Sequence, residues 1–113
     1  MKRFVLAAAM LLVAVAIALP TTIAGGAASV RVTGKEFRFT LSPRTVTHGT
    51  VTFRFTNRGR LRHDFKIAGK KTRIIPRGRT ATLRVRLRRG TYRYICTVPG
   101  HADAGMKGRL RVR

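Results

Sequence analysis

Val51-Thr-Phe53-Arg-Phe55 is the stretch that predicts the fold most clearly, because apolar and polar side chains alternate strictly along it. This alternation has a period of two, which is typical of a β-strand buried on one face only. The same pattern recurs in other short segments, namely Val30–Val32, Phe37–Leu41, Leu83–Leu87, Tyr92–Tyr94 and Leu110–Val112. Together with less regular segments at Asp64–Ala68 and Thr72–Ile75, it predicts about eight short strands.

Turn-forming residues separate these segments at intervals of about eight to twelve residues. They are Gly34, Ser42-Pro43, His48-Gly49, Asn57–Gly59, Gly69, Pro76–Gly78, Arg89-Gly90 and Pro99-Gly100. The sequence therefore predicts an all-β fold, an antiparallel Greek-key β-sandwich. Its predicted inner core consists of Phe37, Phe39, Phe53, Phe55, Leu83, Val85, Leu87 and Tyr94.

The first 28 residues differ from the rest and have the anatomy of a secretory signal. A positive start at Lys2 and Arg3 precedes an unbroken apolar run over Phe4–Leu19, and small residues follow at 24–28. We predict a signal peptide over residues 1–28, cleaved between Gly26 and Ala28, and a single domain over 29–113. An uncleaved membrane anchor is the alternative, although the run is shorter than the roughly 20 residues that span a bilayer.

Export changes the interpretation of Cys96, the only cysteine in the chain. Exported cysteines are usually paired in disulfides, and Cys96 has no partner within this chain. We expect a periplasmic, cell-envelope or extracellular protein in which this thiol has a chemical role.

The chain is strongly basic, with 25 Lys plus Arg against 3 acidic residues. Without Lys2 and Arg3 the predicted domain still carries a net charge of +20. Such a balance raises the possibility of a nucleic acid or an anionic surface as partner. The arginines are spread along the outward phase of the strands, and Trp is absent, so no specific nucleic-acid site is expected. Arg as an ordinary outward-facing strand residue is the simpler interpretation.

The segment Cys96-Thr-Val-Pro-Gly-His101-Ala-Asp-Ala-Gly-Met106 brings a thiolate, an imidazole and a thioether together with the spacing C-x₄-H-x₄-M. A trigonal His₂Cys site with a long axial Met is the arrangement that selects copper for electron transfer. His63, at the start of a predicted strand, is the candidate second imidazole. Each residue alone also has an ordinary interpretation, as core or turn. His48 lies in a predicted turn and is expected to face solvent.

This loop resembles that of the cupredoxins, the small blue copper proteins of the azurin, auracyanin and plastocyanin type, and C-T-x-P-G-H is nearest the azurin and auracyanin form. The resemblance implies one type 1 copper ion that cycles between Cu(I) and Cu(II), with a thiolate that gives an intense blue colour. In this family an Asn often follows the first histidine and hydrogen-bonds near the residue after the cysteine. Here these positions are Asp64 and Thr97, and we expect them to brace the two ligand segments.

We therefore interpret the chain as an exported electron carrier with one copper ion at His63, Cys96, His101 and Met106. Its expected partners are redox proteins, acidic given the charge of the chain, and we expect a monomer that also associates with an anionic envelope surface. A copper carrier or storage protein, and a basic polyanion-binding sandwich with a copper site, remain alternatives. An enzyme is not expected, since four protein ligands leave no open position for a substrate.

The short residues around His101 suggest where an electron leaves. Pro99, Gly100, Ala102 and Ala104 surround this histidine with small side chains, so a partner could approach the imidazole edge closely. A small apolar patch ringed by charge is typical of a weak docking site. The same residues could equally be simple loop formers.

Overall fold

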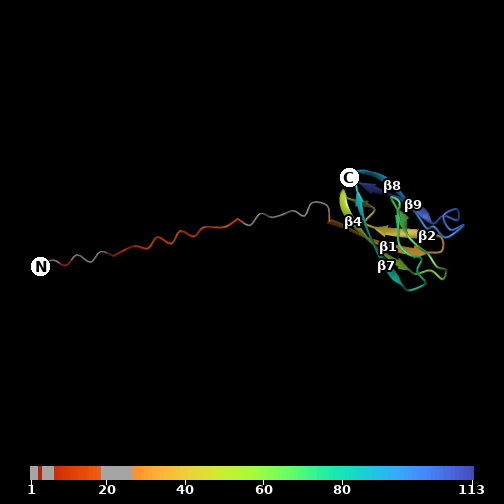
Figure 1. The fold of residues 1–113 in the computed structure, drawn as a ribbon, viewed down its shortest axis with the longest axis horizontal. Helices are drawn as coiled ribbons and strands as arrows, with labels where there is room; N and C mark the ends of the chain where they lie inside the picture. The colour runs from red at the N-terminus through yellow and green to blue at the C-terminus, as the bar shows by residue number, and fades with distance from the viewer. Residues whose placement is uncertain (1–2, 4–6, 19–26) are drawn as a thin grey trace.

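The computed structural model describes residues 3, 7–18 and 27–113, and its ordered strands lie in the last of these ranges (Figure 1). Within the described residues there are nine strands: β1 (Ala27–Lys35), β2 (Arg38–Ser42), β3 (Thr45–Val46), β4 (Gly49–Asn57), β5 (Lys66–Ile67), β6 (Lys70–Lys71), β7 (Thr80–Leu87), β8 (Gly90–Ile95) and β9 (Lys107–Val112).

Much of the predicted signal peptide, including Gly26 at the predicted cleavage site, lies outside the described residues. Residues 7–18 are described as exposed chain without regular secondary structure. The described part of the chain contains no helix long and apolar enough to cross a membrane. Strand β1 begins at Ala27, which pairs with Thr50 of β4.

The strands of residues 27–113 form two sheets, with the orders β2-β1-β4-β7 and β3-β9-β8-β5-β6. The prediction of an all-β two-sheet sandwich is thus confirmed. Most neighbouring strands are antiparallel, but in this described range β1 pairs with β4, and β3 with β9, in parallel. Alternation indicates which face of a strand is buried and not the direction of its neighbour, so the sequence did not reveal these two pairs.

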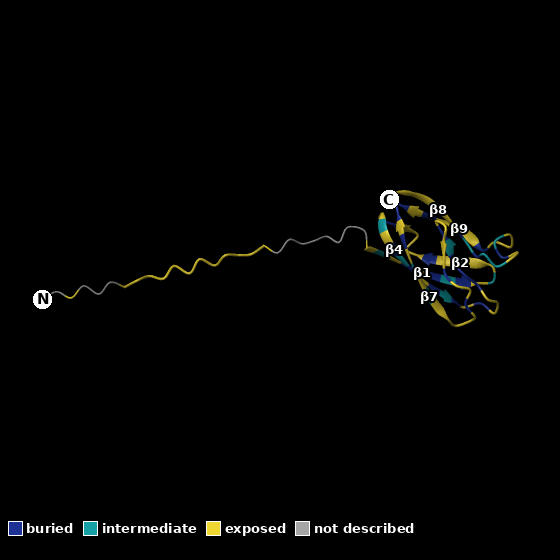
Figure 2. Cartoon of the chain, in the orientation of Figure 1, coloured by how far each residue is buried: buried dark blue, intermediate teal, exposed yellow. Residues whose placement is uncertain are grey.

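The core lies between the two sheets, where the apolar phase of each strand is buried (Figure 2). Val51, Phe53 and Phe55 of β4 are fully buried, while Arg54 between them is exposed. The alternation over Val51–Phe55 predicts this outcome, and β4 is one of the two inner strands of the first sheet, between β1 and β7.

Phe65 joins the two sheets through their aromatic side chains. Its ring is 5.2 Å from that of Phe53 and 5.4 Å from that of Phe39 in the first sheet, and 5.6 Å from that of Tyr94 in the second. These centroid separations are those of favourable aromatic pairs. Because Phe65 is fully buried and two residues beyond His63, the core fixes the chain next to that histidine.

Two sequence predictions at the turn between β1 and β2 are wrong. Phe37 was expected in the inner core, but it lies in the turn itself and is 37% exposed, because β2 begins only at Arg38. Gly34 was expected in a turn, but it is a buried residue of β1, paired with Phe39 and Asn57.

The strands predicted over Asp64–Ala68 and Thr72–Ile75 are shorter than expected. The first reduces to β5, because Ala68 and Gly69 adopt positive φ angles of 50° and 74° and turn the chain into β6. In the second, the Thr72 hydroxyl accepts the Phe65 N–H at 3.1 Å, and beyond it only Ile75 makes a bridge, to His63.

Candidate metal centre

The loop with the C-x₄-H-x₄-M spacing joins neighbouring strands at one end of the sandwich. Cys96 directly follows β8, and Met106 directly precedes β9. Backbone hydrogen bonds close the loop, from Cys96 N to Met106 O and from Met106 N to His101 O, each at 3.0 Å. All three candidate ligands are therefore held by a short segment that begins and ends in a sheet.

His63 reaches the same end from the long connection between β4 and β5. Its backbone makes a β-bridge with Ile75, with N–O distances of 3.2 Å and 2.9 Å. Phe65 anchors the following residues in the core, so the His63 side chain has a fixed origin. The His63 ring is fully buried and lies 4.9 Å from that of His101.

Three of the four predicted ligands converge on one point. The Nδ1 atoms of His63 and His101 are 3.0 Å apart, and Cys96 Sγ lies 3.8 Å and 3.6 Å from them, respectively. A point in the plane of these atoms lies about 2.0 Å from each, close to the metal–nitrogen and metal–sulfur distances of roughly 2.0 to 2.3 Å in proteins. The site therefore fits a trigonal metal ion without movement of a ligand segment.

Met106, the fourth predicted ligand, is fully buried at the same end. The absence of a side chain at Gly34 of β1 gives it room, since a Cβ there would lie 3.2 Å from the Met106 methyl carbon and 2.7 Å from the Phe55 ring. The backbone ties of Met106 to Cys96 and His101 keep it next to the other three residues. Its role as axial ligand stays a prediction.

Asp64 and Thr97, the predicted bracing pair, are in contact. The Thr97 backbone N–H donates to Asp64 Oδ1 at 2.6 Å, and the Thr97 hydroxyl donates to Oδ2 of the same carboxylate. Asp64 is fully buried. This double hydrogen bond joins the residue after His63 to the residue after Cys96.

Burial sets the protonation states of two of the ligands. It lowers the pKa of His63 below its ordinary value, with the Glu36 carboxylate opposing this shift, and it raises the pKa of the Cys96 thiol. At neutral pH the imidazole of His63 is therefore neutral and ready to bind a metal. The thiol of Cys96 holds its proton until a metal ion displaces it.

Sequence reasoning missed two residues at this end, Glu36 and Phe37, which form the turn between β1 and β2. Glu36 Oε1 lies 3.4 Å from His63 Nε2. The Phe37 ring packs edge-on against that of His101, with a centroid distance of 5.1 Å and an interplanar angle of 72°. The small number of acidic residues was the one available signal for Glu36.

His48 does not contribute to this cluster. It is exposed between β3 and β4, and its backbone N–H donates to the carbonyl of Arg113 at 2.7 Å, at the C-terminal end of β9. The expectation that His48 is a solvent-facing turn residue is confirmed.

Comparison with known proteins agrees with the fold and the cluster. A family model described as a cupredoxin-like domain matches residues 6–112. No curated protein sequence matches the chain.

Solved structures of auracyanins and of rusticyanin superpose on this one. Auracyanin A, a "blue" copper protein from the green thermophilic photosynthetic bacterium Chloroflexus aurantiacus, is 25% identical over 78% of this chain and 100% of its own, with a TM-score of 0.65. Rusticyanin from Thiobacillus ferrooxidans is 25% identical over 79% of each chain, with a TM-score of 0.64. A reduced auracyanin from Roseiflexus castenholzii, 21% identical over 79% of this chain and 99% of its own, has the same fold, with a TM-score of 0.66.

Proposed function

We propose, from the premise that this chain belongs to the cupredoxin-like domain family, that it carries single electrons on one type 1 copper ion. The triangle of His63 Nδ1, His101 Nδ1 and Cys96 Sγ is the observation that carries this proposal. Two imidazoles and one thiolate in a trigonal arrangement, with a thioether beside them, form the ligand set of blue electron-transfer sites.

The contacts of the proposed ligands within the chain would keep the geometry of this site the same in both oxidation states. His63 is fixed by its bridge to Ile75, and Cys96 and Met106 are fixed by the ends of β8 and β9. The bound copper would supply the one-electron couple between Cu(I) and Cu(II). Ligands that keep their positions in both oxidation states favour rapid electron exchange.

His101 is the proposed exit for the electron. It is 9% exposed, whereas His63 and Met106 are fully buried and Cys96 is 1% exposed. The Phe37 ring packs edge-on against it, and the neighbouring loop residues Pro99, Gly100 and Ala102 have small side chains, so we expect a partner to meet an apolar collar around the imidazole edge. A partner docking there could receive an electron without entering the fold.

The closed site argues against the alternative of a copper carrier. All four proposed ligands are buried, and three of them belong to one loop that backbone hydrogen bonds close between β8 and β9. With four protein ligands there is also no open position for a substrate, so we do not propose an enzymatic activity.

We further propose that the protein is exported and works beside acidic redox partners at an anionic envelope surface. The signal-like composition of residues 1–28 and the net charge of +20 on the predicted domain support this location. N-terminal sequencing of the protein recovered from its host would test cleavage between Gly26 and Ala28. An intact residue 1 on all molecules would contradict it.

The visible spectrum of the purified domain with added Cu(II) tests the electron-carrier proposal. We expect an intense thiolate-to-copper charge-transfer band, abolished by Cys96→Ser and perturbed or lost in His63→Ala and His101→Gly. His48→Ala is the matched control, because it removes an imidazole at a distance from the cluster, and it should keep the wild-type spectrum. One bound Cu(II) per wild-type chain without the band would reject the proposal.

A further inference from the structure

Glu36 contacts His63, one of the proposed ligands, from outside the ligand loop. It lies in the turn between β1 and β2, and its side chain is 30% exposed beside the fully buried His63. Glu36 Oε1 is 3.4 Å from His63 Nε2. The other ring nitrogen of His63, Nδ1, is the atom directed at Cys96 and His101. One nitrogen of the His63 ring therefore faces the metal centre, and the other faces the Glu36 carboxylate.

The carboxylate of Glu36 is itself fixed. The backbone N–H of Leu61 donates to Oε1 at 2.6 Å, and this hydrogen bond is the largest cause of a lowered Glu36 pKa, about 2. The absence of a side chain at Gly59 makes room, since a Cβ there would lie 2.6 Å and 2.8 Å from the two carboxylate oxygens. Glu36 is therefore an anion with a defined place beside His63.

A buried amide supports the loop that receives Glu36. Asn57 donates from Nδ2 to the carbonyls of Leu61 and Ile75, at 2.8 Å and 2.9 Å, and its Oδ1 accepts the Gly59 N–H at 2.9 Å. All polar atoms of this side chain are thus used within the fold. Ile75 is also the bridge partner of His63. The Asn57 amide therefore holds both Leu61, which donates to the Glu36 carboxylate, and Ile75, which pairs with the backbone of His63.

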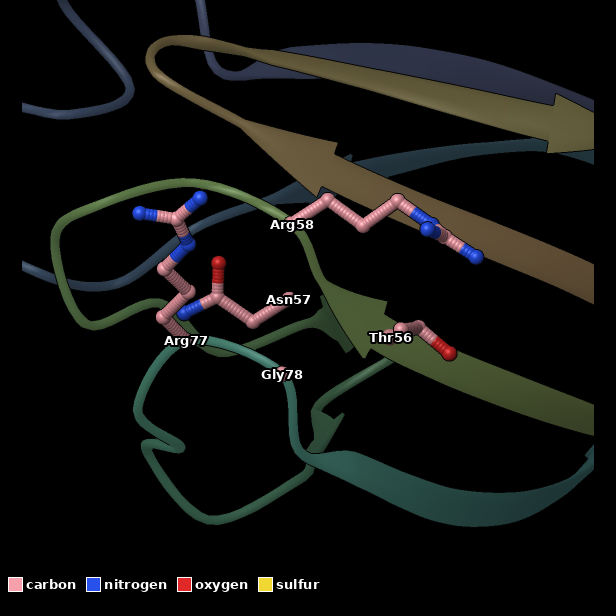
Figure 3. A pocket seen from close by; sticks show the side chains of 5 residues that line it. All are labelled: Thr56, Asn57, Arg58, Arg77 and Gly78. Atoms are coloured by element: carbon pink, nitrogen blue, oxygen red, sulfur yellow. The ribbon is translucent and has the colours of Figure 1, made fainter.

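Figure 3 shows the Asn57 amide at the end of β4, beside a hollow that Arg58 and Arg77 also line. None of the residues labelled there is a carboxylate. Acidic residues are scarce in the whole chain, with three against 25 Lys plus Arg. Two of the three, Glu36 and Asp64, hydrogen-bond within the segments that hold the proposed ligands.

We propose that Glu36 is a positioning residue of the metal centre: its carboxylate accepts the Nε2–H of His63, holds the tautomer that presents Nδ1 to the ion, and adds negative charge that favours Cu(II). This inference rests on the proposed function. A hydrogen bond from a metal-bound histidine to a carboxylate orients the ring and makes it a stronger donor. Both effects stabilise the more highly charged ion and lower the reduction potential.

Three variants separate position from charge. Glu36→Gln removes the charge, and Glu36→Asp keeps the charge but shortens the reach by one methylene. Asp103→Asn is the matched control, because it removes the same charge from an exposed residue of the ligand loop. The measurements are Cu(II) affinity, reduction potential and the thermal midpoint of the metal-free protein.

For Glu36→Gln we expect Cu(II) affinity to fall by about 10-fold or more, the usual cost of losing such a partner. We also expect a higher reduction potential and a retained blue band. Glu36→Asp should lose affinity with a smaller change of potential, and Asp103→Asn should change both quantities less than Glu36→Gln.

Two results would overturn the inference. Unchanged affinity and potential in Glu36→Gln, with only a lower thermal midpoint, would mean that Glu36 merely caps the Leu61 loop. Equal potential shifts in Glu36→Gln and Asp103→Asn would reduce its role to general charge.

A measurement on the wild type covers the case in which the variants do not fold. Nitrogen-15 NMR of the metal-free protein at neutral pH should show the neutral His63 ring protonated at Nε2, with slow exchange of that proton. Protonation of His63 at Nδ1 would overturn the inference. The proposed function is tested separately by the wild-type blue band, so failure of one is distinguishable from failure of the other.

Discussion

Met106 shows how a single side chain could adjust the proposed copper site. It is fully buried, and its backbone is hydrogen-bonded to Cys96 and His101. Met106→Leu is close to volume-conserving, so the fold should persist at a cost below about 1.5 kcal/mol.

We expect the copper-loaded Met106→Leu protein to stay blue and to have a higher reduction potential than wild type. The reason is that a weak thioether donor stabilises Cu(II) more than Cu(I), and leucine has no donor atom. Cyclic voltammetry alongside the visible spectrum measures both quantities. An unchanged potential would indicate that Met106 is not near the metal.

At the scale of single residues, sequence reasoning identified the three side chains that converge within the described part of the chain, His63, Cys96 and His101. Spacing and chemical softness were enough for Cys96 and His101, because their loop is continuous in sequence. The contacts of Glu36 and Phe37 with the two histidines could not be predicted from the sequence. They depend on where the turn between β1 and β2 lies in the folded structure. Alternation even placed Phe37 in the core, one residue before the strand begins.

Among the elements, the connection from β4 to β5 and the ligand loop form separate supports for the site. The double hydrogen bond of Asp64 with the N–H and hydroxyl of Thr97 links them, next to the pairing of β5 with β8. Loss of an acceptor from a buried donor costs about 1–3 kcal/mol. One carboxylate therefore adds to what the β5–β8 pairing does for the relative position of the two ligand segments.

Two substitutions of Asp64 should have different effects. Asp64→Ala removes both hydrogen bonds, so we expect the metal-free protein to lose about 1–3 kcal/mol of unfolding free energy. Asp64→Asn can keep a bond to each Thr97 group while removing the charge, so its stability should change less, and its copper potential should rise. Urea denaturation and voltammetry measure these quantities. Wild-type stability in Asp64→Ala would show that the two segments do not depend on this link.

The sequence predicted long elements better than short ones. Strands β4, β7 and β8 follow the predicted alternation, because each has one face in the core. β5 and β6 are two residues each, and their region is held by the Thr72 hydroxyl and by the burial of Phe65. Such side-chain contacts have no period in sequence, so pattern reasoning overestimated these strands.

At the scale of the whole molecule, the proposed metal site lies at one end of the sandwich, and the chain carries 25 Lys plus Arg against 3 acidic residues. Opposite-charge steering can raise association rates by roughly 10 to 1,000-fold, and it weakens as salt shortens the screening length. Charge at this scale would govern how often a partner arrives, while the collar around His101 would govern transfer after arrival.

We therefore expect the bimolecular rate of electron transfer to an acidic acceptor to fall as salt concentration rises. Ala102→Glu should slow transfer at every salt concentration, because it alters close approach at His101 while the net charge barely changes. Stopped-flow rates across a salt series measure both effects. A wild-type rate indifferent to salt would remove steering as the role of the charge and favour retention on an anionic polymer instead.

The turn between β1 and β2 touches both imidazoles of the cluster with consecutive residues, Glu36 on His63 and Phe37 on His101. By the proposed role of Glu36, a mutation in its codon would change the thermodynamic driving force of electron transfer. A mutation in the codon of Phe37 would change which partner surfaces can come close enough to His101 to exchange an electron. Neither codon encodes a proposed ligand or a buried core residue. Descendants of this gene could thus diverge in potential and in partner through two adjacent codons, with the sandwich and its ligands left intact.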